Sequence, residues 1–396
     1  MNASGARSIL PPLTPEEAQH SGNVAALIAA QVRAAGGWLS FERFMELALY
    51  APGLGYYSAG SSKIGSGGDF VTAPESSDLF SACLARQCAQ VLALTGGEIL
   101  ELGAGTGRMA GALLGALAAL GRLPERYAIL EVSADLAERQ RTRLKELPAQ
   151  LRERLVWLER LPERPINGVM LANEVVDALP CRRFTCRGSG VRELGIALAE
   201  GAGDGFREQF GTADAVLAQA WRELRASLPG ALPEGYTSEV CLRVAPWIAS
   251  LAASLSRGAL LISDYGLPRR HYYHPNRVSG TLRCHFKQRA HDDPCINVGV
   301  QDITAWVDFT RVAEAGSEAG LEVSGFATQA AFLLSLGLET LVAAEADPVQ
   351  HARLAGEARR LIMPEEMGEA FKIMALTRGC DAALAGFELQ DLRHLL

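Results

Sequence analysis

The sequence lacks the features that mark several other classes of protein. No uninterrupted apolar run reaches the roughly 18–20 residues that span a membrane, and the first residues contain neither an apolar signal core nor an extended arginine-rich amphipathic stretch. None of the eight cysteines forms a C-x-x-C pair, which argues against a zinc site and predicts reduced thiols. The net charge of −7 argues against a phosphate-backbone ligand. We therefore expect a cytoplasmic protein without a bound metal.

The most informative segment that is present is 98–108, EILELGAGTGR. It predicts a short strand ending in Glu101, a loop with Gly103, Gly105 and Gly107, and then a helix. Glycines let a ligand approach the backbone closely, and a helix start offers free N–H groups. The G-x-G-x-G spacing differs from the dinucleotide pattern G-x-G-x-x-G, and a carboxylate at Glu101 would repel a pyrophosphate. The same carboxylate suits the ammonium and sulfonium groups of S-adenosylmethionine (SAM), the cofactor we expect.

Further apolar segments predict the rest of a parallel sheet. Strands are expected over 127–132, 155–158, 168–172 and 258–263, because short apolar runs alternate there with helical patterns. An acid that ends the strand after a glycine loop commonly holds ribose hydroxyls. Ligands of such sheets lie beyond the carboxyl ends of the strands. We therefore expect one crevice to contain Glu101, Glu131, Asn173 and Asp264.

The chain before the glycine loop predicts a helical cap. Thr14 and Glu17 form a capping box before one helix, and Ser40 begins a second. The segment 51–80 is rich in Gly and Ser but also carries Tyr56, Tyr57, Asp69, Phe70 and Glu75. Two interpretations remain open for it: a loop that folds over a ligand, or a surface loop with anchoring rings.

The fourth predicted strand carries the expected chemistry. In MLANEVVDALPCRRF, Asn173, Glu174 and Asp177 follow the strand end. On a helical turn, Glu174 and Asp177 would share a face. Two carboxylates suit a planar cation such as arginine guanidinium, which they would orient and whose proton they would accept. The alternative is a capped helix start with a solvated acidic face.

The chain resembles the MidA family of SAM-dependent protein arginine methyltransferases, whose mitochondrial members assist assembly of respiratory complex I. The resemblance runs from about Phe41 to Phe371. The matching motifs, in the family's order, are GDFVTAPESSDLF, ELGAGTGR, ANEVVDALPCRRF, LLISDYG, GTLRCHFKQRAHDDP, VGVQDITAWVDF and EMGEAFKIMAL.

The resemblance implies an α/β fold, with a seven-stranded class I SAM-dependent methyltransferase (Rossmann-like) core. An N-terminal helical cap and cofactor-covering loop would occupy 1–95, and the core 96–396, with insertions at about 179–257, 267–315 and 327–368. Glu174 and Asp177 would act as catalytic residues. The cofactor would contact Gly68, Asp69, Thr72, Glu101, Gly103, Gly105, Gly107, Glu131 and Asn173. The sequence departs from the family at Trp306, where many members have His, which leaves the acceptor in question.

The stretch 269–289 is basic and interleaved with aromatic residues. It could be a lid or protein-docking loop, a structural loop, or a nucleic-acid contact. His285 and His291, with Asp292 and Asp293, lack the spacing of a metal site. Final antiparallel core strands are expected over 316–326 and 371–376.

These observations predict methyl transfer to a protein arginine, with a respiratory NADH:quinone oxidoreductase subunit as a candidate partner. Two alternatives remain. A nucleic-acid or small-molecule methyltransferase would share the cofactor site, although base methylation favours an aromatic residue after the fourth strand, where this chain has Glu174. A non-catalytic assembly factor would need the glycine loop but not Glu174 or Asp177. The sequence does not determine the modified protein, the degree or symmetry of methylation, or the oligomeric state.

Overall fold

The computed structural model describes residues 10–59, 72–188, 190–201 and 205–396. Gly68 and Asp69 lie outside these residues. Within the described residues, no helix is both long enough and apolar enough to cross a membrane.

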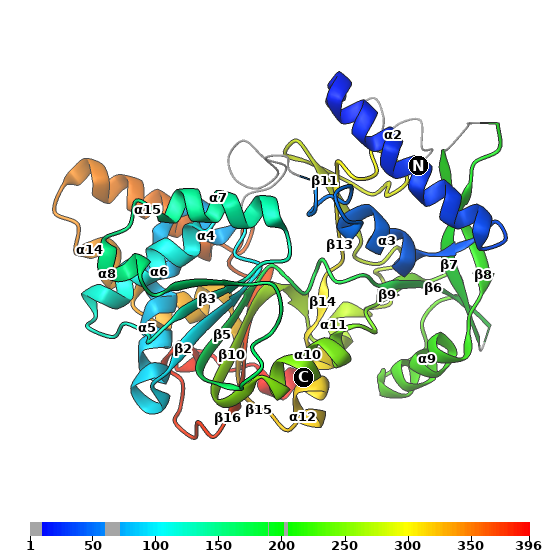
Figure 1. Cartoon of the computed structure of the whole chain (residues 1–396). Helices are drawn as coiled ribbons and strands as arrows, with labels where there is room; N and C mark the ends of the chain where they lie inside the picture. The colour runs from blue at the N-terminus through cyan, green and yellow to red at the C-terminus, as the bar shows by residue number, and fades with distance from the viewer. Residues whose placement is uncertain (1–9, 60–71, 189, 202–204) are drawn as a thin grey trace.

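A mixed sheet forms the core of the molecule (Figure 1). Its strand order is β15-β16-β10-β5-β2-β3-β4, and short β14 pairs with the end of β10. The five strands from β10 to β4 are parallel, whereas β16 runs antiparallel to β10 and to β15. The strands are β2 (Glu98–Leu102), β3 (Tyr127–Leu130), β4 (Leu155–Leu158), β5 (Ile166–Asn173), β10 (Leu255–Leu267), β14 (Val307–Asp308), β15 (Glu322–Thr328) and β16 (Phe371–Arg378). Seven strands form the continuous path of this sheet, and the two-residue β14 beside β10 adds an eighth to the seven expected.

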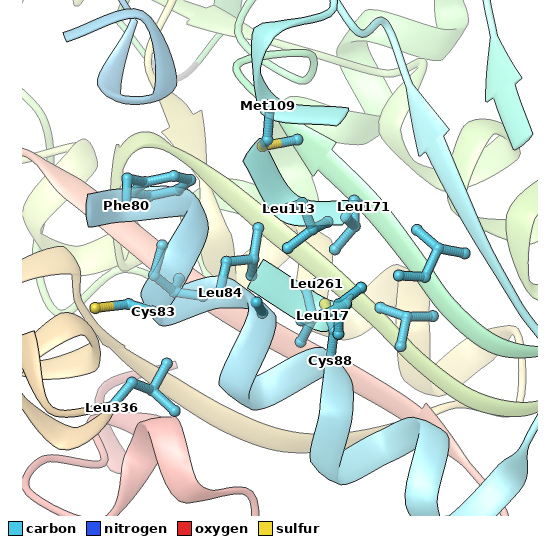
Figure 2. Close-up of a cluster of buried hydrophobic side chains, with 14 of the residues drawn as sticks. Phe80, Cys83, Leu84, Cys88, Met109, Leu113, Leu117, Leu171, Leu261 and Leu336 are labelled. Atoms are coloured by element: carbon cyan, nitrogen blue, oxygen red, sulfur yellow. The ribbon is translucent and has the colours of Figure 1, made fainter. Parts of the chain in front are cut away.

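Both faces of this sheet are buried, which explains why its strands read as continuous apolar runs. One face packs on α5 (Asp78–Thr95), α6 (Arg108–Ala119), α13 (Gln329–Ser335) and their neighbours. Figure 2 shows this cluster, in which Phe80, Leu84 and Cys88 of α5 face Leu171 and Leu261 of the sheet. The other face packs on α10 (Val244–Ala253) and α12 (Phe309–Glu318). The remaining helices near the core are α4 (Ala73–Ser76), α7 (Ala134–Leu144), α8 (Ala149–Arg152), α14 (Leu338–Ala343) and α15 (Pro348–Ile362).

A second sheet, of five strands, lies beside the core (right side of Figure 1). Its strands are β1 (Leu39–Ser40), β6 (Arg182–Arg187), β7 (Gly190–Leu198), β8 (Phe206–Thr212) and β9 (Thr237–Val240), and α9 (Ala215–Ser227) packs on it. Most of this sheet comes from the first insertion, at about 179–257. None of the seven residues of β8 is fully buried, and β8 pairs with β7.

The N-terminal helices α2 (Pro15–Ala34) and α3 (Phe41–Tyr50) pack on β7 of the second sheet. The expected helical cap is therefore attached to the inserted sheet. The capping box is present, since Glu17 N donates to Thr14 Oγ1 (3.2 Å) and Thr14 N donates to Glu17 Oε2 (2.7 Å). Helix α5, which the sequence assigned to the N-terminal unit, packs on the core sheet.

The second insertion, at about 267–315, forms secondary structure of its own. It contains α11 (Arg269–Tyr272) and a small sheet of β11 (Arg283–Phe286), β12 (Arg289–His291) and β13 (Asp302–Thr304). Short 3-10 turns at Ala385–Phe387 and Arg393–Leu395 end the chain. The strand expected over 316–326 was partly wrong, because α12 continues to Glu318 and β15 starts only at Glu322.

Candidate active site

A cavity of about 400 Å³ opens at the carboxyl ends of β2, β3 and β5. Glu101, Glu131 and Asn173 line it together, which confirms that these strand ends meet. The rest of the wall comes from the glycine loop, α4, the turn after β5 and three aromatic residues, Tyr50, Tyr57 and Trp247. The cavity lies where ligands of parallel sheets bind.

The glycine loop has the conformation that its sequence predicts. Gly103, Gly105 and Gly107 have φ angles of 62°, 53° and 81°, values that favour glycine. Gly103 and Gly105 line the cavity. Gly107 instead precedes α6, and a Cβ there would lie 3.4 Å from Gln140 Cγ. The absence of a side chain at Gly107 therefore leaves room for α7 to pack beside the start of α6.

Glu101 is buried at the end of β2. Tyr127 donates a hydrogen bond from its hydroxyl to Glu101 Oε2 (2.6 Å). Burial raises the pKa of Glu101 to about 7, the charge of Glu131 adds to the rise, and the Tyr127 hydrogen bond opposes it. A ligand cation beside Glu101 would favour the ionised carboxylate.

Glu131, after β3, is held in a fixed orientation. Ser133 N donates to Glu131 Oε1 and Gln140 Nε2 donates to Glu131 Oε2, each at 2.9 Å. Burial raises the pKa of Glu131 in spite of these bonds. The neighbouring Val132 is 77% exposed although it lines the cavity, so an apolar side chain stands at the entrance.

The α4 segment is fastened to the glycine loop. Thr72 caps α4 and lines the cavity. Thr106 hydrogen-bonds through its hydroxyl to the carboxylate of Glu75, and Arg108 Nη1 donates to the carbonyl of Glu75 (2.6 Å). Thr106 and Arg108 thus hold α4 against the glycine loop. Sequence reasoning did not foresee this role for them.

The turn after β5 differs from the helical turn that was expected. Glu174 has a left-handed φ of 52°, which is uncommon for a residue with a side chain, and residues 174–178 form no helix. Glu174 N donates to Ser263 O (2.8 Å), so the adjacent strand holds this conformation. Asn173 Nδ2 donates to Glu174 Oε1 (3.3 Å), and Asn173 Oδ1 is buried with no protein partner among the described residues. Strained residues of this kind cluster at functional sites.

Asp177 and Asp264 are buried and do not line the cavity, so the expectation that Asp264 shares the crevice with Glu101, Glu131 and Asn173 was wrong. Asp264 Oδ2 accepts from Val176 N (2.9 Å) and Asp177 N (3.2 Å), which fixes the turn. Asp177 lines a small adjoining pocket that also contains Trp306, rather than the cavity itself. Burial raises the pKa of Glu174, Asp177 and Asp264, and repulsion between neighbouring carboxylates raises each further. Within the described part of the chain, none of the three forms an ion pair with Arg, Lys or His.

Three of the six Arg and Lys residues in the basic 269–289 stretch form ion pairs within the fold. Arg269 pairs with Asp308 and Glu314, Arg283 pairs with Asp292, and Lys287 pairs with Glu17. The guanidinium of Arg277 lies over the ring of Trp306, 5.4 Å from its centroid. These contacts favour the structural interpretation over a nucleic-acid surface. Among the described residues, no group of three His, Cys, Asp or Glu side chains is placed to hold a metal ion.

The described residues fit SAM. Gly103 and Gly105 have positive φ angles that favour glycine, so no side chain projects from this part of the wall. Two carboxylates from adjacent strand ends, Glu101 and Glu131, line the same cavity. Such a set suits a ligand that carries an ammonium group and ribose hydroxyls. The unpartnered Asn173 Oδ1 offers a further acceptor.

Comparisons with known proteins also indicate a SAM-dependent methyltransferase. A protein arginine methyltransferase NDUFAF7, mitochondrial, from Danio rerio is 27% identical, with 86% of this chain and 84% of the relative covered. The Homo sapiens protein of the same name is 28% identical, with 86% and 80% covered. A solved structure from Burkholderia thailandensis, bound to S-adenosyl-homocysteine, is 40% identical with a TM-score of 0.91, and covers 98% of this chain and 100% of its own.

These names correct one expectation. The cytoplasmic location inferred from the N-terminal sequence is contradicted, because the curated relatives are named as mitochondrial proteins. The inference rested on the lack of a recognisable targeting pattern, and such a lack does not identify a compartment.

A family model described as S-adenosyl-L-methionine-dependent methyltransferase matches residues 83–327, which include β2, the glycine loop, the turn after β5 and β10. The model covers more than half of the chain, and the core sheet and cavity lie mostly within it. The chain belongs to this family of SAM-dependent methyltransferases.

Proposed function

We propose that this protein transfers a methyl group from SAM to a guanidinium nitrogen of an arginine in another protein. The observation that carries the proposal is a group of three carboxyls, Glu174 half-buried at the cavity wall with Asp177 and Asp264 buried beside it, which have no cationic partner among the described residues. A buried acid without a partner is costly when ionised, so the site favours a ligand that brings its own positive charge. The NDUFAF7 relatives are named as protein arginine methyltransferases, which supports arginine as that ligand.

The residues take separate roles in this proposal. Glu174, on the cavity wall, orients the acceptor, and Asp177, in the adjoining pocket, adds negative charge that attracts it. The cofactor contacts are assigned to Thr72, Glu101, Gly103, Gly105, Glu131 and Asn173, all of which line the cavity. Gly107 supports the loop from behind. Gly68 and Asp69 stay predictions from the sequence.

When bound, SAM supplies an electrophilic methyl carbon attached to a sulfonium. The chain then has two tasks. The first is to place the nitrogen in line with that carbon, which the Glu174 carboxylate on the cavity wall can do because a carboxylate pairs with a planar guanidinium in a defined geometry. The second is to receive the proton that the nitrogen loses as its bond to carbon forms, and the carboxylate of Glu174 is the acceptor on the cavity wall.

The first experiment is transfer of labelled methyl from SAM into proteins of the source organism's lysate, followed by acid hydrolysis and amino-acid analysis. We expect label in methylated arginine. Glu174→Gln should reduce transfer about 10²- to 10⁴-fold while SAM binding is kept, since a general base contributes this much. Glu163→Gln, at an exposed acid paired with Arg160, is the matched control.

Each contrary result has a specific meaning. Undiminished transfer by Glu174→Gln would remove Glu174 from the mechanism. Absence of label from protein, with SAM still bound, would favour a non-catalytic assembly factor or a non-protein acceptor, and nucleic acid would be assayed next. Recombinant subunits of the respiratory NADH:quinone oxidoreductase are the first defined substrates to assay, because the family resemblance suggests them.

A further inference from the structure

We propose that Tyr50 and Tyr57, here called the tyrosine pair, bind the acceptor guanidinium against an aromatic wall. This inference rests on the proposed function and assigns the acceptor end of the same cavity. It gives the N-terminal segment a role in substrate selection that the core cannot supply alone.

The tyrosine pair lines the same cavity as the glycine loop but comes from the N-terminal segment, from α3 and the turn after it. Gly103, Glu101 and Glu131, in contrast, come from the strand ends of the core sheet. The Tyr50 hydroxyl donates to the carbonyl of Ala178 (2.9 Å), directly after Asp177. The rings therefore stand next to the turn that carries the acidic residues.

The rings are fixed before any ligand binds. Tyr50 and Tyr57 stack with centroids 5.5 Å apart and an interplanar angle of 22°. Tyr57 OH donates to Asp302 Oδ1 (3.0 Å), and Tyr57 N donates to Leu49 O (2.9 Å). The chain returns so closely to α3 that a Cβ at Gly55 would lie 2.5 Å from Ala51 N. A prearranged wall of this kind loses little side-chain entropy on binding.

The hydroxyls of the pair are already engaged, so its contribution to a ligand comes from the rings. Burial and the nearby charges of Asp302 and Asp177 raise the pKa of both tyrosines, which keeps them neutral. A neutral ring beside carboxylates attracts a cation through its π electrons, and a flat guanidinium also matches a flat ring. Arginine fits this combination better than the compact, strongly hydrated ammonium of lysine.

The test measures cofactor and acceptor binding separately. With S-adenosyl-homocysteine present, the affinity of N-acetyl-arginine amide for the full chain is measured by ligand-observed NMR, with the citrulline amide as the uncharged analogue. We expect Tyr50→Leu and Tyr57→Leu each to weaken binding of the arginine amide about tenfold. Affinity for S-adenosyl-homocysteine should change by less than about twofold, and Tyr57→Phe should keep most of the arginine affinity because the ring remains.

Controls separate this proposal from misfolding and from failure of the proposed function. Phe210→Leu removes a partly exposed ring outside the cavity and should leave both affinities unchanged. Retained S-adenosyl-homocysteine binding shows that a variant is folded. If wild type prefers the arginine amide and the Leu variants bind it equally well, the tyrosine proposal alone is wrong. If the Leu variants lose S-adenosyl-homocysteine instead, the pair belongs to the cofactor. If wild type does not distinguish arginine from citrulline, both proposals are wrong.

Discussion

At the scale of single residues, the site depends on backbone conformations as much as on side chains. Gly103 and Gly105 hold positive φ angles that open the cavity wall, and Glu174 holds one in spite of its side chain. The strain at Glu174 places its carboxyl in the cavity instead of on the helical face that the sequence suggested. The sequence could reveal the glycines, because their type and spacing are informative. It could not reveal the turn at Glu174, which depends on a hydrogen bond to Ser263 of β10, a strand that is adjacent in the sheet but distant in the sequence.

The first prediction concerns Gly103. Gly103→Val should abolish SAM binding, because a β-branched residue is strained at a φ of 62° and its side chain would fill the cavity wall. Isothermal titration calorimetry measures the loss. Gly115→Ala, at a glycine of α6 with nothing within 4 Å of an added Cβ, should bind SAM normally. Intact SAM affinity in Gly103→Val would mean that the glycine loop does not contact the cofactor.

The second prediction concerns the pH dependence produced by Glu101. Its pKa is raised from 4.5 to about 7, so ionisation disfavours the folded state. This residue's contribution to the free energy of unfolding is complete below pH 4.5 and is lost as the pH rises to about 7, a change of about 3 kcal/mol. Glu101→Gln should remove that part of the decline. Urea unfolding without SAM at pH 5 and pH 8 measures it.

Glu159→Gln, at an exposed acid, is the control for Glu101→Gln and should keep the slope of the wild type. An unchanged slope in Glu101→Gln would show that Glu101 is already ionised at pH 5. A cationic ligand should reverse the effect, because it favours the ionised carboxylate. SAM affinity is therefore expected to increase as the pH rises towards 8 in the wild type and to vary less in Glu101→Gln.

At the scale of elements, prediction succeeded where local pattern decides the structure. Strands β2, β3, β4, β5 and β10 were expected, because a sheet buried on both faces produces continuous apolar runs. Their ends were displaced by a few residues; β10, for example, continues to Leu267 because β14 and β16 pair along it. The second sheet was missed, since its strands pair across a long insertion and their apolar positions also suit helices.

The third prediction tests the attachment of α4 to the glycine loop. Arg108→Ala removes the hydrogen bond to Glu75 O and the ion pair with Asp78, in which the side chains are 35% and 70% exposed. Because exposed ion pairs contribute little, stability should fall by at most about 1 kcal/mol. SAM affinity should fall about three- to tenfold as Thr72 loses its fixed position. Equilibrium binding and thermal unfolding distinguish the two effects.

Arg122→Ala, at an exposed residue beyond the end of α6, is the matched control for Arg108→Ala. Loss of stability without any loss of SAM affinity would contradict a role for α4 in the cavity. Such a result would leave the Arg108 contacts as a local support of the helix start.

At the scale of the whole molecule, the cavity is shared between two parts of the fold. The core sheet supplies the cofactor end, whereas α3 and the segment after it supply the tyrosine pair. Helix α3 is also attached to the core side, because Arg243, just before α10, bonds through Nε to Glu42 Oε1 (2.7 Å) and through Nη1 to Glu46 Oε1 (2.8 Å). The position of the acceptor wall relative to the glycine loop depends on such contacts between distant segments.

The fourth prediction follows from this arrangement. Arg243→Ala should release α3 from the start of α10, and partly exposed ion pairs of this kind contribute up to about 1 kcal/mol each. The KM for an arginine acceptor should rise about three- to tenfold, while SAM affinity stays within about twofold, because the glycine loop belongs to the other part of the cavity. Arg43→Ala removes a neighbouring cation whose ion pair, among the residues that the structure describes, is with Glu46 of the same helix, and it should leave both constants unchanged. Arg243→Ala could instead weaken SAM binding as much as acceptor binding. In that case the position of α3 would affect both binding steps, and the division of roles between the core and the N-terminal helices would be wrong.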